Sequence, residues 1–216
     1  MMAYKRNQIE EAIGRLFHPN AKEPDCELVT RIKRLLELDR ALGRKHRSRD
    51  AEEANFAFFS DEAPGTGVDI SFSGYEAFAL LNALRIMQHG WPQGFAVAVM
   101  RRMRPDLESE HGRILKQPAD KLFDQEAIFA KARAGDIAVD NTDPVFLTFV
   151  SRAKPEPDDA KDSPAFAVCR GLAKVGQFSR DVGASSLTMF ELVTLAHRLS
   201  GMLINTEPKS RGRPRG

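Results

Sequence analysis

The stretch from Ser73 to Pro105 constrains the fold more than any other part of this sequence. Ser73 followed three residues later by Glu76 is a capping box, in which each side chain bonds the main-chain amide of the other residue. Apolar side chains then recur at helical spacing, at Phe78, Leu80, Leu81, Leu84 and Met87. Gly90 suits a helix C-cap, and Pro92 suits the first turn of a following helix. The pattern predicts two helices joined by a short turn.

The second of these helices has a basic end. Arg101, Arg102 and Arg104 follow its apolar positions, and we expect Pro105 to stop it. Residues 73–104 therefore read as a helix-turn-helix-like unit. They resemble the core of a MerR-type winged helix, in which a strand or wing leads into a helix, a glycine turn and another helix. The resemblance implies a DNA-binding fold, and it assigns no individual recognition residue.

Two further helices are expected on the N-terminal side, over residues 5–17 and 27–42. Strand-like runs at 55–59 and 68–72 flank a Pro-Gly-Thr-Gly turn and predict a small hairpin. The runs contain several aromatic residues, Phe56, Phe58, Phe59 and Phe72. These rings could stack on the bases of a single-stranded nucleic acid, or they could pack in the core. Packing is the favoured interpretation.

The C-terminal half predicts a smaller β-containing region. Strands are expected near 145–150 and 165–169, antiparallel and joined by a long acidic loop. Asp124 is expected to cap a helix over 125–134 with Phe129 on its inner side, and a last helix is expected over 187–203.

These elements predict a mainly helical α+β protein. A helical domain with a small hairpin is expected over residues 1–116, and a β-hairpin plus helix region over 117–205. Residues 206–216, the basic tail, have too few apolar side chains to order themselves and are expected to be disordered.

The distribution of charge is more informative than its sum. A net charge of +2, from 32 basic and 30 acidic residues, does not by itself indicate a polyanionic partner. The basic residues are concentrated in two places, first in the basic loop (residues 44–49), which contains Arg44, Lys45, Arg47 and Arg49. This loop could contact nucleic-acid phosphates, or it could be a solvated turn whose charges offset the dipole of the preceding helix.

The second concentration lies in the basic tail, at Lys209, Arg211, Gly212, Arg213, Pro214 and Arg215. This segment resembles an AT-hook, the short minor-groove motif built around Arg-Gly-Arg-Pro. The resemblance implies that Arg211 and Arg213 lie along the floor of a narrow A·T minor groove, where the negative potential attracts arginine. It also implies that Gly212 permits close approach and that Pro214 directs the chain outwards. Ser210 replaces the proline that often precedes the first arginine of the motif. A solubilising terminus is the alternative interpretation of this tail.

No enzyme signature stands out in the sequence, although an enzyme of an unrecognised class remains a third possibility. The five histidines are scattered, and the two cysteines, Cys26 and Cys169, form neither a disulfide framework nor a zinc-ligand spacing. A nucleophilic role for Cys169 is less expected than burial as a small thiol. We therefore expect no metal and no cofactor. The sequence shows neither the apolar core of a secretion signal nor a membrane span, so a cytoplasmic location is expected.

The sequence thus predicts a protein that binds double-stranded, A·T-rich DNA, acting as a transcriptional or nucleoid-type regulator. The predicted contact residues are those of the basic loop, the basic tail and the helix end at Arg101, Arg102 and Arg104. The alternative is a protein-interaction or dimerisation module of an accessory operon or mobile element. In that case the hairpin at 145–169 and the last helix would form a homodimer or partner interface.

Overall fold

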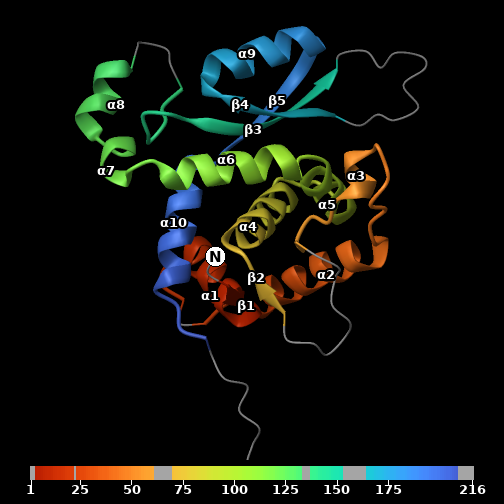
Figure 1. Cartoon of the computed structure of the whole chain (residues 1–216). Helices are drawn as coiled ribbons and strands as arrows, with labels where there is room; N and C mark the ends of the chain where they lie inside the picture. The colour runs from red at the N-terminus through yellow and green to blue at the C-terminus, as the bar shows by residue number, and fades with distance from the viewer. Residues whose placement is uncertain (1–2, 22, 61–69, 133–136, 153–163, 209–216) are drawn as a thin grey trace, which may run out of the picture. The chain divides into compact units, whose positions relative to one another are not determined.

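The structure is a computed structural model that describes residues 3–21, 23–60, 70–132, 137–152 and 164–208 (Figure 1). The chain forms two compact units. The first unit comprises Met1–Glu108 and Arg198–Gly216, and the second comprises Ser109–His197. The sequence predicted a division after residue 116, whereas the structure divides after Glu108. Glu108 lies within helix α6 (Arg104–Lys116), and residue 116 is the last residue of the same helix. The mainly helical α+β class expected from the sequence is confirmed.

The first unit is largely helical. Its helices are α1 (Arg6–Phe17), α2 (Cys26–Leu42), α3 (Ala51–Ala54), α4 (Gly74–Gln88) and α5 (Gln93–Arg102), with the start of α6 and the end of α10 (Val193–Ile204). Helix α4 is its centre, because every residue from Tyr75 to Leu84 is buried. A helix that is buried on all sides lies in a core rather than on its surface.

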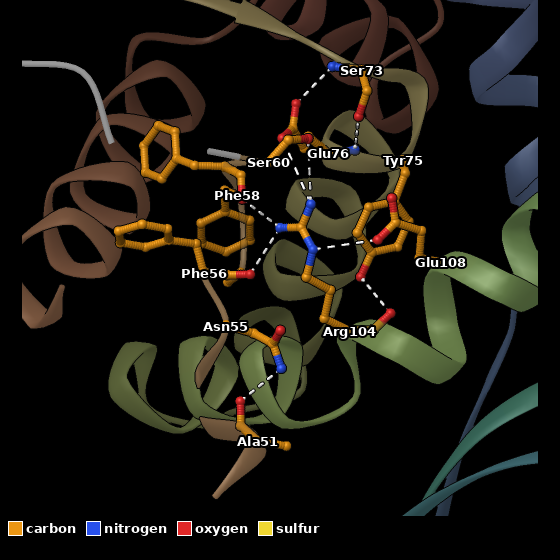
Figure 2. Close-up of polar contacts among 12 residues, drawn as sticks. Ala51, Asn55, Phe56, Phe58, Ser60, Ser73, Tyr75, Glu76, Arg104 and Glu108 are labelled. Atoms are coloured by element: carbon orange, nitrogen blue, oxygen red, sulfur yellow. Dashed lines mark hydrogen bonds and ion pairs between the residues drawn. The ribbon is translucent and has the colours of Figure 1, made fainter. Parts of the chain in front are cut away.

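The predicted capping box is present at the start of α4. Ser73 Oγ accepts the Glu76 amide at 3.2 Å, and Glu76 Oε2 accepts the Ser73 amide at 2.7 Å (Figure 2). Gly90 has a φ of 89°, a left-handed conformation that favours glycine, and Pro92 is the N-cap of α5. The two helices and their turn are therefore as expected. Pro105 differs from the prediction, since it lies in the first turn of α6 instead of ending α5 outright.

Replacing Ser73 by alanine should lower the free energy of unfolding by about 1 kcal/mol, because the Glu76 amide loses its side-chain acceptor. Urea denaturation measures the change. Thr30→Ala is the matched control, since the exposed Thr30 hydroxyl bonds only a carbonyl within α2. A loss at Ser73 no larger than the loss at Thr30 would contradict the prediction.

The prediction of a small hairpin over 55–72 is wrong, because the two expected strands do not pair with each other. Residues 55–59 form no strand, and β2 (Ser71–Phe72) pairs antiparallel with β1 (Tyr4–Lys5) instead. The phenylalanines of this region are buried at 5% exposure or less, which confirms packing rather than an exposed stacking surface. Phe56 and Phe59 meet edge to face with their centroids 5.7 Å apart.

The second unit contains a three-stranded antiparallel sheet in the order β4-β3-β5. Its strands are β3 (Val145–Arg152), β4 (Ala165–Arg170) and β5 (Ala184–Glu191), and its helices are α7 (Ala119–Leu122), α8 (Gln125–Lys131) and α9 (Gly171–Val182), with parts of α6 and α10. The predicted antiparallel pairing of residues 145–150 with 165–169 is confirmed. Phe146, Cys169 and Val175 form a buried cluster that joins the sheet to α9.

Two details of this unit correct the sequence-based prediction. Residues 184–191 form strand β5, so the last helix begins at Val193 and not at Leu187. Leu187 and Phe190 satisfy a helical spacing, but the segment gains a full ladder of bonds to β3 as a strand. Asp124 caps α8 as predicted, whereas Phe129 is 74% exposed instead of lying inside.

Candidate nucleic-acid interface

The basic loop follows α2 and is closed on itself by main-chain bonds. The Lys45 amide donates to Glu53 O at 2.7 Å, and the Ser48 amide donates to Lys45 O at 2.9 Å. Asp50 then caps the short helix α3 by accepting the Glu52 amide at 2.9 Å. The loop therefore has a defined main-chain path even though much of it is exposed.

Glu53 neutralises one cation of this loop. Its carboxylate pairs with Lys45 Nζ at 2.7 Å and accepts the Ser48 hydroxyl at 2.8 Å. The bonds from Lys45 and Ser48 hold the pKa of the Glu53 carboxyl below its ordinary value. Lys45 is thus a weaker candidate for phosphate contact than the sequence implied.

Arg47 and Arg49 are in a different situation. Both are exposed, and within the described part of the chain neither forms an ion pair or a hydrogen bond. Arg44 instead lies over the Phe56 ring, with its guanidinium carbon 5.5 Å from the ring centroid. The loop therefore exposes two guanidinium groups, those of Arg47 and Arg49, that have no polar partner among the residues the structure describes.

Arg101 of α5 holds both ends of the segment that contains this loop. Its Nη1 donates to Glu52 O at 3.1 Å, and its Nη2 donates to Gly43 O. Its Nε donates to Asp39 Oδ1 at 2.8 Å. The Arg101 side chain is only 4% exposed, and its charge is neutralised by Asp39 within the first unit.

Asp39 of α2 completes this anchor. It is fully buried, and its two carboxylate oxygens accept the amides of Ala57 at 3.1 Å and Phe58 at 2.9 Å. Burial raises the pKa of the Asp39 carboxyl, against the opposing effects of these two amides and of Arg101. The Asp39–Arg101 pair therefore fixes residues 43–58 to α2 and α5.

Arg104 makes a second buried anchor just after the first. Figure 2 shows its guanidinium directed at residues 56–60 and at Glu76. Nη1 donates to Phe56 O at 2.8 Å and to Phe59 O at 2.7 Å, and Glu76 Oε1 lies 3.8 Å from Nη2. Tyr75 lies beneath it with the guanidinium carbon 5.2 Å from the ring centroid, and burial raises the pKa of this phenol. Arg104 is thus occupied by internal partners.

The predicted helix-end cluster is therefore divided. Arg101 and Arg104 are buried supports of the segment that carries the basic loop. Arg102 is exposed, and its guanidinium pairs with Glu52 at 2.7 Å. The structure brings the basic loop and the end of α5 together, but most of their charges are matched by carboxylates.

The basic tail lies outside the described residues from Lys209 onward, so the positions of Lys209, Arg211, Gly212, Arg213, Pro214 and Arg215 are not described. Its first residue is fixed, in contrast to the expected disorder over 206–216. Thr206 is 4% exposed, and Gln8 Nε2 donates to Thr206 O at 2.7 Å. The tail therefore starts from a set point on the first unit.

The residues that the sequence did not single out are the acidic partners Asp39, Glu52 and Glu53. They lie far from Arg101 in the chain, and Asp39 precedes it by 62 residues. An aspartate at an apolar-face position of the 27–42 helix was the one available signal, because a buried carboxylate requires a partner.

Metal binding and thiol chemistry both depend on which side chains the described residues bring together. They contain no group of three or more histidine, cysteine or acidic side chains that could hold a metal ion. Cys169 is buried, and burial raises the pKa of its thiol, which disfavours the nucleophilic thiolate. None of the helices in the described ranges combines the length and apolar character that a membrane crossing requires.

Comparison with known proteins adds no assignment, since no family model, curated protein or solved structure matches the chain.

Proposed function

We propose that the protein binds double-stranded DNA through the basic tail and through Arg47 and Arg49 of the basic loop. The observation that supports this most directly is a pair of exposed arginines that have no carboxylate partner among the described residues. They lie on a loop whose path is fixed by the buried Asp39–Arg101 anchor. Pre-ordered cations lose less conformational entropy when they meet phosphates than cations on a free loop do.

The tail supplies the minor-groove contact in this proposal, and the loop supplies phosphate contacts. Because Thr206 is anchored, Arg211 can lie at most about 18 Å from it and Arg213 about 25 Å. Arg101 and Arg104 are left out of the contact surface because their charges are used internally.

A cytoplasmic transcriptional or nucleoid-type regulator is the role that fits these contacts. The two described cysteines are both free thiols, which suits a reducing compartment. The alternative partner surface at 145–169 is less favoured, because Val145, Leu147, Phe149 and Val150 of β3 are at most 1% exposed. No cofactor enters the proposed activity.

The proposal is tested by electrophoretic mobility shift with A·T-rich and G·C-rich duplexes over a range of salt concentrations. The full chain should prefer the A·T-rich duplex, and a chain truncated after Pro208, which keeps the Thr206 anchor, should lose that preference. Arg47→Ala/Arg49→Ala should weaken binding to both duplexes and reduce the slope of log affinity against log salt by about 2.

The matched control is Lys174→Ala/Arg180→Ala, which removes two exposed cations from α9 of the second unit. It should leave the salt slope unchanged. Equal A·T preference with and without the tail would refute the minor-groove contact. An equal salt slope in the loop variant and the control would refute the loop contact.

A further inference from the structure

Strand β5 is an edge strand without the usual protection. It has β3 as its only neighbour in the described sheet. Residues 184–190 read Ala-Ser-Ser-Leu-Thr-Met-Phe and contain neither a charged residue nor a proline. Edge strands normally carry lysine, proline or another feature that blocks pairing with a further chain. The register shift near Ser151 and Arg152 affects only one end of the β3–β5 pairing.

The outer side of β5 is also accessible. Ser185, Ser186 and Leu187 are exposed, and Leu187 retains 43% of its surface although it is apolar. Within the described ranges, residues 184–189 make main-chain hydrogen bonds only to β3. The opposite edge, β4, has no large exposed apolar side chain. Strand β5 is therefore the edge of this sheet that carries a large exposed apolar side chain.

We propose that β5 pairs antiparallel with β5 of a second copy of this chain, about a twofold axis at Leu187. The two three-stranded sheets then form one continuous six-stranded sheet. Residues that face each other across such an axis are Leu187 with its own counterpart, Ser186 with Thr188, and Ser185 with Met189. No like charges are opposed anywhere from Ala184 to Phe190, which is the condition that a self-pairing edge must satisfy.

The proposed contact between the two β5 strands buries only a small area. Pairing of one eight-residue strand buries less than the roughly 1,200 Å² of a standard stable interface. The dimer should therefore be weak, with a dissociation constant on the order of micromolar or above, and should form as concentration rises. Self-association of this kind requires no DNA and would place two basic tails in one assembly.

Sedimentation equilibrium of the full chain, without DNA, tests the proposal. The wild type should show a concentration-dependent dimer. Leu187→Lys and Leu187→Glu should each raise the dissociation constant at least tenfold, because like charges then face each other at the axis. An equimolar mixture of the two variants should restore association, which a merely misfolded pair of variants would not do.

Phe129→Lys is the control, since it places the same charge at another exposed apolar residue of the second unit. It should leave the dissociation constant unchanged. Hydrogen exchange supplies a second readout, because the outward amides of β5 should slow with concentration in the wild type and not in Leu187→Lys. A wild type that stays monomeric, a dimer unaffected by Leu187→Lys, or a mixture that fails to associate would each overturn the proposal. A monomeric wild type would point instead to an extended peptide of another protein as the partner of β5.

Discussion

Replacing Asp39 by alanine should lower the free energy of unfolding of the first unit by about 4 kcal/mol. The change leaves the Arg101 guanidinium buried without its carboxylate, and it leaves the Ala57 and Phe58 amides without an acceptor. Breaking a buried ion pair from one side costs far more than losing an exposed pair, because the remaining charge stays out of water. Urea denaturation followed by circular dichroism measures the loss.

Glu37→Ala is the matched control for Asp39→Ala. It removes the same charge from the same helix, but Glu37 is exposed and its pair with Lys33 spans 3.7 Å. Its effect should stay within about 0.5 kcal/mol. Native-state hydrogen exchange gives a local test, since the Ala57 and Phe58 amides should lose protection in Asp39→Ala. A loss of stability similar to that of Glu37→Ala, or unchanged protection of these amides, would contradict the role assigned to the anchor.

Acidification from pH 6.5 to 4 should destabilise the second unit by about 3 kcal/mol through His111 alone. His111 is 8% exposed, and burial, with a smaller effect of His197, lowers its pKa from 6.5 to about 4. Between these two values the unfolded chain binds a proton that the folded chain does not. The contribution is therefore fully present above pH 6.5, falls as pH decreases, and is completely lost only below pH 4.

His111→Gln separates this effect from other acid titrations. The variant should be less sensitive to pH than the wild type between 6.5 and 4, whatever its stability at pH 7. His18→Gln, which removes an exposed imidazole from the first unit, is the control for loss of a histidine elsewhere in the chain. Glu110 and Asp143 also titrate, but Arg170 and Arg113 outweigh burial to lower the pKa of Glu110, and Arg113 lowers that of Asp143. The stability that these two carboxylates contribute is therefore lost at a lower pH than the contribution of His111. Identical pH profiles for wild type and His111→Gln would refute the prediction.

The sequence predicted correctly those features that are stabilised by residues close together in the chain. The capping box at Ser73, the Asp124 cap and the antiparallel hairpin of β3 and β4 depend on residues close together in sequence, and all three are present. Strand β5 was missed because Leu187 and Phe190 lie three positions apart, which is a helical spacing. The pairing with β3 that makes this segment a strand has no local signal. The pairing of β1 with β2 joins residues nearly seventy positions apart and has no local signal.

The candidate site was predictable only in outline. The basic loop was identified from composition, but composition does not tell a free cation from a paired one. Arg101 and Arg104 look like a solvent-exposed basic helix end in the sequence, and only the folded positions of Asp39 and Glu76 show that they are internal. Arg47 and Arg49 have no such partner among the described residues, and this distinction comes from tertiary structure.

The bond from Gln8 to Thr206 spans 198 positions and joins segments from both sides of the second unit. On the ribosome, α1 is synthesised long before α10, so the first unit lacks its last helical segment until the second unit has already emerged. Domains that form early during synthesis can fold as they appear. Here the second unit has the complete set of its residues before the first unit does, although it lies later in the chain. Completion of the first unit, and with it the fixed start of the basic tail, therefore comes after synthesis of the second unit.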